Sequence, residues 1–324
     1  MLVSVVIPLY NKEKYISETI QSVLDQTYGS FEIIIVDDGS TDDSLKEAEK
    51  FDDERIRIIS QKNAGVSAAR NRGIKEARFD FIAFLDADDL WEKDFLEIMM
   101  ALKEKYNQCS VFAVNYKIML HDMRMQSPII NGLAENFKEG ILENYFQIAS
   151  QSDPIICSIS LMVRKKAIES IGGFPVEIRA GEDLLTWARL AARYDIAYTL
   201  EQKATFCKWD DGKNAFPRIP DNHDRVGEEL RKLLTEGDKD KIDGLEKYIA
   251  YWHKIRVAIF LRLDKKEEAR KEFKKMSEFA EKNIKYFIYA LLVYSPELLN
   301  KRLLKISNYF NTLIRNFKKK QGRL

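Results

Sequence analysis

The chain has 324 residues, of which 45% are hydrophobic and 32% are charged. It is long enough for one large domain and a smaller appendage, and its composition is typical of a globular protein with a sizeable core. The 52 Lys and Arg nearly balance the 51 Asp and Glu, so the net charge of +1 gives no reason to expect a nucleic-acid partner.

Cysteine usage and the chain ends bear on location. Cys109, Cys157 and Cys207 form neither a disulfide framework nor a CxxC pair, which indicates a reducing compartment. The chain opens directly on an apolar strand pattern, so no signal peptide is expected. The longest apolar run near the C-terminus, 286–293, is shorter than the roughly 18–20 residues of a bilayer span. These features predict a cytoplasmic protein that does not cross a membrane.

The first part of the chain alternates short apolar runs with amphipathic segments. We expect strands at 3–8, 31–36, 55–59, 81–85 and 111–116, with helices at 12–26, up to about 51, at 66–77 and at 92–106. This alternation predicts an α/β fold with a Rossmann-like, doubly wound, mostly parallel sheet. Ligands of such sheets bind at the carboxyl ends of the strands.

The remainder is less regular and then becomes helical. A strand-like stretch at 158–163 precedes a short helix, a Gly-Gly-Phe-Pro turn at 172–175 and a helix from about 182 to 194. Beyond residue 221 the pattern is almost purely helical and highly charged. We therefore predict one domain over 1–220 and a mainly α-helical C-terminal region over 221–324.

Polar clusters follow three of the expected strands. They are Tyr10-Asn11, Asp37-Asp38-Gly39-Ser40 and Asp86-Ala87-Asp88-Asp89. In a parallel sheet these places lie along one edge, so the clusters should converge on one crevice. Carboxylates gathered there need neutralising, and a divalent cation that also binds phosphate oxygens would supply the charge.

Each cluster also has a purely structural interpretation. Asp37 to Ser40 reads as a turn followed by an N-cap at Ser40 or Thr41. Asp86 to Asp89 reads as the cap of a helix that contains Trp91. The recurrence of both clusters at strand ends within one βαβα unit favours a binding site.

Four motifs in the same order carry a resemblance to a known family. They are V-S-V-V-I-P-L-Y-N, I-I-I-V-D-D-G-S-T-D, N-A-G-V-S-A-A-R-N-R-G and F-I-A-F-L-D-A-D-D. The chain resembles the inverting GT-A glycosyltransferases of the family-2 type over about residues 2–210. The resemblance implies a GT-A fold, with a nucleotide-sugar-binding half over 1–118 and an acceptor-binding half over 119–220.

The resemblance also implies roles on the donor side. Pro8, Tyr10 and Asn11 would shape the base pocket, with Tyr10 against a uracil ring. Asp38 would accept the uracil N3–H, with Asp37 beside it, and Arg70 would face the phosphates. In the DxD motif Asp86 would lie toward the ribose and Asp88 on Mn²⁺ or Mg²⁺, with Asp89 as the alternative principal ligand. Both residues also have an interpretation without a binding role. Tyr10 would then be an aromatic residue at the end of a strand, and Arg70 a solvated charge on a helix.

The segment G-G-F-P-V-E-I-R-A-G-E-D-L-L-T-W resembles the acceptor side of the family. Glu182 and Asp183 at a helix N-terminus are otherwise read as capping acids that favour the helix dipole. The resemblance makes Asp183 the general base that takes the proton of the acceptor hydroxyl, with Glu182 shaping the acceptor site. The Q-x-x-R-W signature of processive synthases is absent, and Lys208-Trp209 is the nearest basic-aromatic pair. We therefore expect single or few additions to a glycan or lipid-linked glycan.

The last 28 residues combine charge with an apolar stripe. Residues 297–324 contain eight basic residues and one acidic one, and apolar residues recur at helical spacing from Leu299 to Phe317. Such a helix either lies on the inner face of an anionic cell membrane or packs on the protein. The sequence leaves both open, as it does the donor sugar and whether the chain forms a homo-oligomer.

Two other functions are alternatives to a glycosyltransferase. Neither a G-x-G-x-x-G nor a P-loop motif is present, which argues against a dehydrogenase or a nucleotidyltransferase. An inactive nucleotide-sugar-binding or scaffold protein with the same fold is the remaining alternative, since fold alone does not establish activity.

Overall fold

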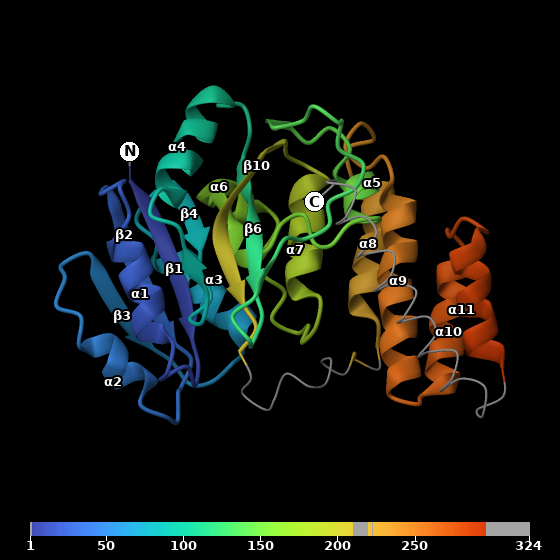
Figure 1. The fold of residues 1–324 in the computed structure, drawn as a ribbon, viewed down its shortest axis with the longest axis horizontal. Coiled ribbons are helices and arrows are strands. Elements are labelled where there is room, and N and C mark those ends of the chain that lie inside the picture. Colours follow the sequence, from blue (N-terminus) through green and yellow to red (C-terminus); the bar gives the residue numbers. More distant parts are fainter. Residues whose placement is uncertain (1, 210–219, 222, 296–324) are drawn as a thin grey trace.

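The structure, a computed structural model, describes residues 2–209, 220–221 and 223–295. It is an α/β fold in which helices cover both faces of a central sheet, and further helices stand at one side (Figure 1). The strands are β1 (Val3–Leu9), β2 (Phe31–Asp37), β3 (Ile56–Ser60), β4 (Phe81–Phe84), β5 (Leu90–Trp91), β6 (Val111–Met119), β7 (Met125–Gln126), β8 (Glu139–Ile141), β9 (Leu161–Arg164) and β10 (Ile196–Cys207). The helices are α1 (Ile16–Leu24), α2 (Ser44–Glu49), α3 (Val66–Glu76), α4 (Phe95–Lys105), α5 (Tyr145–Ala149), α6 (Lys165–Ser170), α7 (Glu182–Ala191), α8 (Arg225–Glu236), α9 (Leu245–Arg262), α10 (Lys266–Ser277) and α11 (Ile284–Tyr294), with a short 3₁₀ turn at Ser158–Ser160.

The sheet is mostly parallel at its amino-terminal side. Its strands follow the order β3-β2-β1-β4-β9-β6-β10-β5, with β7 beside β6 and β8 beside β10. β1 runs parallel to β2 and β4, β2 to β3, and β6 to β10, whereas β9 is antiparallel between β4 and β6. The parallel strands therefore end along one edge of the sheet, the lower edge in Figure 1.

The central strands are apolar on both faces because each face has its own core. All seven residues of β1 and of β2 are buried. Val6 and Ile34 pack in one core with α3 and α7, and Val5 and Ile33 pack in the other with α1 and α4. This double burial explains the continuous apolar runs of the sequence, since a strand with one wet face alternates instead.

Several expected elements differ from the structure. The expected strand at 158–163 is a 3₁₀ turn followed by β9, and Trp91 lies in β5, so the helix expected from residue 92 begins only at Phe95. Neither Ser40 nor Thr41 caps a helix, because α2 begins at Ser44. The expectation also omitted β10, where the pairing with β6 shifts register between Thr199 and Ala204 and interrupts the strand pattern.

The C-terminal helices continue the core of the sheet domain. Val226 and Leu230 of α8 and Trp252 of α9 belong to the same apolar cluster as Val6 of β1. An outer cluster, including Val257, Phe273 and Leu292, joins α9 to α10 and α11. The boundary expected at 220 therefore separates sheet from helices along the chain but does not interrupt the packing.

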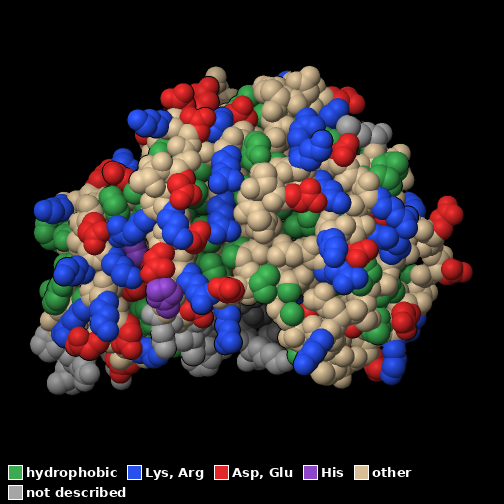
Figure 2. Space-filling model, turned by 180° about the vertical axis from the view of Figure 1, so that it is seen from behind, with side chains coloured by type: hydrophobic (Ala, Val, Ile, Leu, Met, Phe, Trp, Pro, Cys, Tyr) green, Lys and Arg blue, Asp and Glu red, His purple; other side chains and the backbone are tan. Residues whose placement is uncertain are grey.

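Two expectations concern membranes. Among the described residues, no helix is both long and apolar enough to span a bilayer. The basic amphipathic helix expected over 297–324 lies outside the described residues. Seen from behind, the described surface interleaves acidic and basic side chains, in keeping with the nearly neutral composition (Figure 2).

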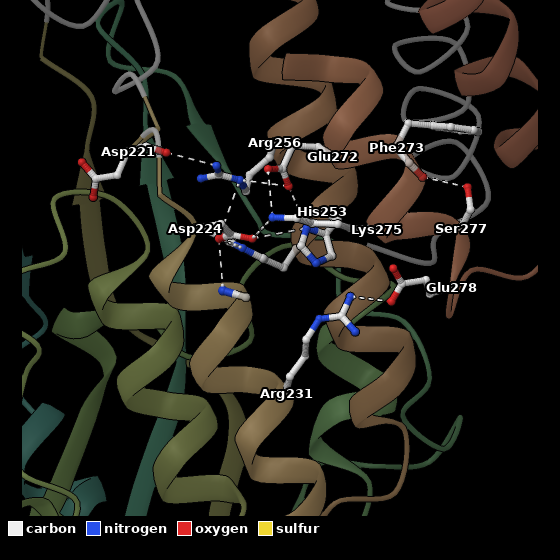
Figure 3. A network of polar contacts seen from close by, with 12 residues as sticks. Asp221, Asp224, Arg231, His253, Arg256, Glu272, Phe273, Lys275, Ser277 and Glu278 are labelled. Carbon is white, nitrogen blue, oxygen red and sulfur yellow. Dashed lines mark hydrogen bonds and ion pairs between the residues drawn. The ribbon is translucent and has the colours of Figure 1, made fainter. Parts of the chain in front are cut away.

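A buried network of charged side chains joins α8, α9 and α10 (Figure 3). Asp224 caps α8 by accepting from Gly227 N at 3.1 Å and also accepts from Trp252 Nε1 at 2.9 Å. His253 Nδ1 lies 2.8 Å from Glu272 Oε2, and Arg256 Nε lies 3.1 Å from the same oxygen. Although Asp224, His253 and Glu272 offer ligand atoms within 4.8 Å of one another, Arg256 already supplies a countercharge. The network is thus an ion-pair clamp between helices.

This clamp predicts an acid-sensitive contribution to stability. Burial raises the pKa of Glu272, but the hydrogen bond from His253 and the charge of Arg256 outweigh it and lower the pKa to about 2. A lowered pKa stabilises the fold above the unfolded value near 4.5. That stabilisation, on the order of 3 kcal/mol, is lost as the pH falls toward 2.

We expect Glu272→Gln to lower stability at neutral pH and to flatten the fall in stability between about pH 5 and pH 2, as measured by urea unfolding across this range. Glu268→Gln, on the same helix and in no ion pair among the described residues, is the matched control. Parallel pH profiles for Glu272→Gln and the unmodified protein would exclude this role.

Candidate active site

A cavity of about 660 Å³ opens at the carboxyl edge of the sheet. Its walls come from the segments that follow β1, β2 and β4, from the start of α3 and α7, and from the end of β10. Among the expected site residues, those that line it are Pro8, Tyr10, Asp38, Arg70, Asp86, Asp88 and Glu182. The three polar clusters of the sequence therefore meet at one place, as expected from the end of each parallel strand.

Asn11 and Asp37 are not among the lining residues and instead join two loops. Asn11 has a left-handed backbone (φ 51°), and its side-chain oxygen accepts from Thr41 N at 2.8 Å. Its own N–H donates to Ser40 Oγ at 3.2 Å, while Asp37 Oδ1 accepts from Ser40 N at 3.1 Å. These bonds hold the loop after β1 against the loop after β2, which orients the cavity wall.

Asp38 is a buried acceptor at the cavity wall. Its Oδ1 accepts from Gln61 Nε2 at 2.8 Å and from Ala64 N at 2.9 Å, and its Oδ2 accepts from Gly65 N at 2.8 Å. A carboxylate offers about four lone-pair positions, so these three bonds leave capacity for one more donor. The side chain is therefore oriented by the backbone and can still receive an N–H from a ligand.

Arg70 projects from α3 beneath the cavity with 3% of its surface exposed. Its Nη2 donates to Asp86 Oδ1 at 2.7 Å, and its guanidinium lies over the Phe174 ring at 5.1 Å. Burial lowers the pKa of Arg70, but the charges of Asp86, Asp183 and Glu182 outweigh it and raise the pKa. The buried Nε and Nη1 have no hydrogen-bond partner among the described residues, so Arg70 can still donate to an anion.

Asp88 lines the cavity, and its surroundings suit a cation. Its carboxylate contacts the ammonium group of Lys12, and its backbone carbonyl accepts from Trp209 Nε1 at 2.9 Å. Burial raises the pKa of Asp88, Lys12 lowers it, Asp86 raises it further, and the net shift is upward. Positive charge near Asp88 therefore favours its ionised form.

Asp89, expected as an alternative metal ligand, has different surroundings from Asp88. It is 1% exposed, does not line the cavity, and its Oδ1 accepts from Cys207 N of β10 at 2.7 Å. Burial, together with the charges of Asp88 and Asp86, raises its pKa well above the usual value. This geometry favours Asp88 over Asp89 as the ligand and gives Asp89 a role in holding β10.

Glu182 and Asp183 begin α7 on the opposite wall. Glu182 lines the cavity and is 5% exposed, while Asp183 is half-buried and accepts from Leu184 N at 2.8 Å. The charge of Asp183 acts on Arg70 and also on the buried Tyr145 and Tyr248, whose pKa values are raised mainly by burial. Asp183 thus lies between the Arg70 side of the cavity and a tyrosine cluster.

The donor set fits a divalent cation. Asp86 and Asp88 present carboxylate oxygens to the same cavity, and Mg²⁺ and Mn²⁺ prefer oxygen ligands from one or two carboxylates together with phosphates. The upward pKa shift of Asp88 indicates that its ionised form gains from added positive charge. Lys12 supplies part of that charge within the described residues.

Sequence reasoning missed two contacts. Lys12 was read as the start of a helix, although α1 begins at Ile16, and Trp209 was noted only as half of a basic-aromatic pair. Trp209 stacks on Tyr15 with ring centroids 4.4 Å apart and so brings the end of β10 over the loop after β1. The position of Lys12 directly after Tyr10-Asn11, a cluster at a strand end, could have identified it as a candidate site residue.

The buried position of Asp89 yields a prediction about stability. An Asn at this position retains an oxygen that accepts from Cys207 N, so Asp89→Asn should change the free energy of unfolding by less than about 1 kcal/mol. Asp89→Ala leaves a buried N–H without a partner and should cost about 1–3 kcal/mol. Urea unfolding of both variants measures this, and equal losses would show that the hydrogen bond to Cys207 is not what Asp89 supplies.

Several glycosyltransferases are similar in sequence to this chain over much of its length. An uncharacterized glycosyltransferase of Rickettsia felis is 37% identical over 216 residues, which cover 66% of this chain and 34% of the relative. The putative teichuronic acid biosynthesis glycosyltransferase TuaG of Bacillus subtilis is 34% identical over 205 residues, or 62% of this chain and 76% of the relative. The chain thus spans about a third of the length of the rickettsial relatives.

Solved structures share the fold. S. aureus TarS 1–349 in complex with UDP-GlcNAc has a TM-score of 0.66 at 20% identity, covering 99% of this chain and 92% of that one. The same protein in complex with UDP has a TM-score of 0.59, covering 89% and 90%. The family model described as glycosyl transferase family 2 matches residues 4–172, more than half of the chain. The chain therefore belongs to glycosyl transferase family 2 and has its GT-A fold.

Proposed function

We propose that this chain transfers a sugar from a UDP-sugar to a hydroxyl of a glycan or lipid-linked glycan, with Mn²⁺ or Mg²⁺ and with inversion at the anomeric carbon. The observation that carries the proposal is the meeting of Asp38, Asp86 and Asp88 with the buried Arg70 in one cavity. A nucleoside diphosphate needs a base contact, a ribose contact and countercharge for its phosphates, and the cavity offers a group for each.

The base end of the donor belongs at the segment after β1. Tyr10 is 45% exposed at the cavity and offers a ring face on which a uracil can stack, with Pro8 beside it. Asp38 has one remaining acceptor position, which suits the N3–H of uracil. Cytosine lacks a hydrogen at N3, so this acceptor favours uridine over cytidine.

The diphosphate belongs between Arg70 and Asp88. Arg70 has two buried N–H groups for phosphate oxygens, and its bond to Asp86 holds it in place. Asp86 would lie toward the ribose, and Asp88 would hold the metal ion, which as a Lewis acid stabilises the negative charge of the departing diphosphate. Lys12, in contact with Asp88, adds positive charge on the same side.

Asp183 is proposed as the general base. The acceptor oxygen attacks the anomeric carbon, its proton passes to the Asp183 carboxylate, and the bond to the diphosphate oxygen breaks. UDP leaves with the bonding electrons, so the balance is one sugar transferred and one proton released. Attack opposite the leaving group inverts the anomeric centre. Asp183 follows Glu182, which lines the cavity, and its charge acts on Arg70, and both facts support this role.

The proposal for the acceptor is supported by the relatives alone. One is a putative teichuronic acid biosynthesis glycosyltransferase, and another is the UDP-Glc:alpha-D-GlcNAc-diphosphoundecaprenol beta-1,3-glucosyltransferase WfgD of Escherichia coli, 41% identical over 119 residues, or 36% of this chain and 47% of the relative. These names support a cell-envelope glycan or its lipid-linked precursor. Contact of residues 297–324 with the inner membrane surface and the proposed domain limits, 1–220 and 221–324, remain predictions.

The alternative is a scaffold that binds nucleotide sugars without turnover. The presence of Asp38, Asp86, Asp88 and Asp183, together with the buried charge of Arg70 at the same cavity, disfavours it. Burying such groups is unfavourable unless a ligand or partner uses them.

The metal site generates a binding prediction. UDP with Mn²⁺ should raise the melting temperature of the protein, while GDP and TDP with Mn²⁺ should raise it less. Asp88→Ala should abolish the Mn²⁺-dependent shift, and Asp52→Ala, an exposed acid away from the cavity, should retain it. An undiminished shift in Asp88→Ala would refute the assignment of Asp88 to the metal.

The base generates a kinetic prediction. Asp183→Asn should keep the UDP-dependent thermal shift but lower turnover about 10²–10⁴-fold, because the acceptor hydroxyl loses its proton acceptor. Turnover is measured as UDP released from UDP-glucose and UDP-N-acetylglucosamine in the presence of oligosaccharide acceptors. Asp52→Ala again serves as control, and an Asp183→Asn variant with full turnover would exclude the base role.

A further inference from the structure

A second cavity, of about 600 Å³, lies between the proposed acceptor half and the C-terminal helices. One wall comes from residues 129–153, which include α5, and the other from α9, the end of α10 and α11. It shares no lining residue with the donor cavity. Its volume is within the ~300–1,000 Å³ of small-molecule sites, so it is large enough for a specific ligand.

Aromatic side chains dominate the helical wall. Tyr251 of α9, Phe279 after α10, and Tyr286 and Tyr289 of α11 line the cavity, and each is half-buried. An aromatic ring has a negative face, which attracts the weakly positive C–H groups of a sugar ring, and it also removes those apolar groups from water. Four such rings around one cavity suit a ligand that has flat apolar faces.

The opposite wall offers neutral hydrogen-bonding groups. Gln147 donates its amide to Asp243 Oδ2 at 2.7 Å, which leaves its oxygen as an acceptor, and Gln151 is exposed with no side-chain hydrogen bond among the described residues. On the helical wall, Asn283 at the start of α11 accepts from Tyr286 N at 3.2 Å, which leaves its NH₂ group as a donor. Amides that both donate and accept match the hydroxyl groups of a carbohydrate.

The charges that line the cavity cancel. Two lysines, Lys247 and Lys254, are matched by two acids, Asp153 and Glu281. Lys247 pairs with Glu281 at 2.8 Å, and the ammonium group of Lys254 lies 4.4 Å from the Tyr251 ring centroid. A phosphate-bearing ligand would find no net attraction here, in contrast to the donor cavity with its buried Arg70. The cavity therefore favours an uncharged polar ligand.

Packed side chains link the second cavity to the start of α7. Tyr251 also lines a small apolar cavity of about 30 Å³ together with Leu184 and Tyr145. Leu184 follows the proposed base, and the charge of Asp183 acts on Tyr145. Packed side chains thus connect the aromatic cavity to the side of the active site where the acceptor would bind.

We propose that this cavity binds an uncharged oligosaccharide stretch of the acceptor, away from the sugar that is glycosylated. The identification of this glycan as the acceptor rests on the proposed function, but carbohydrate binding at the cavity does not depend on turnover. Such a site would lengthen the residence of a glycan near Asp183 and would favour longer acceptors over single sugars.

The test measures whether short oligosaccharides of glucose, galactose and N-acetylglucosamine bind to the full chain. Binding is detected by saturation-transfer NMR, and the dissociation constant is measured by titration. Tyr289→Ala removes one lining ring and Gln151→Ala one exposed amide. Phe287→Ala, an exposed aromatic of the same helix that does not line the cavity, is the matched control. We expect at least one oligosaccharide to bind, about threefold to tenfold more weakly to Tyr289→Ala, and unchanged to Phe287→Ala and to Asp88→Ala.

Gln151→Ala guards the test against misfolding, because Gln151 is exposed and its side chain makes no hydrogen bond among the described residues, so its removal should change stability little. This variant should also bind more weakly. Binding that is unaffected by Tyr289→Ala and Gln151→Ala, or no binding of any oligosaccharide while UDP still binds with Mn²⁺, would overturn the proposal. Oligosaccharide binding at this cavity without any UDP binding would support it while refuting the proposed function.

Discussion

Negative charge concentrated at the carboxyl edge of the sheet is the constraint on which the rest of the site depends. Like charges about 4 Å apart near a protein surface repel by about 4 kcal/mol. Asp86, Asp88 and Asp89 follow one strand within four residues, and burial adds to the penalty. Two cationic side chains from other elements, Arg70 of α3 and Lys12 after β1, pair with these acids, and the proposed metal ion would add further positive charge at this edge.

Neighbouring acids in one motif thereby acquire different tasks. Asp88 faces the cavity, while Asp89 turns away and accepts from the backbone of β10. In the same way Asp38 lines the cavity, while Asp37 closes a turn. A strand end that presents one carboxylate to the cavity and uses its neighbour in a structural hydrogen bond couples the cavity to the packing beneath it. Substitutions at Asp37 and Asp89, which do not line the cavity, are therefore expected to act first on stability.

The C-terminal helices extend the catalytic domain. Their inner members share its apolar core, and the charged clamp around Glu272 fixes α10 against α8 and α9. Because α10 and α11 are held in this way, they can form one wall of a cavity whose other wall belongs to the sheet domain. The cavity at the carboxyl edge is lined by charged side chains, whereas the charges of the second cavity cancel and its helical wall is aromatic, a division in keeping with the proposed diphosphate at one and the proposed glycan at the other.

The sequence by itself determined the α/β alternation, the strand ends and the family, because buried parallel strands leave continuous apolar runs and each strand end carries polar residues. It also identified Asp38, Arg70, Asp86 and Asp88 as candidate site residues, since they stand in linked motifs. Only the tertiary structure decided which carboxylates face the cavity, since Asp88 and Asp89 are equivalent in local pattern and differ only in what β10 offers them. The same holds for Lys12 and for the aromatic cavity, whose walls, residues 129–153 and residues 247–289, are distant in the sequence and are brought together by packing.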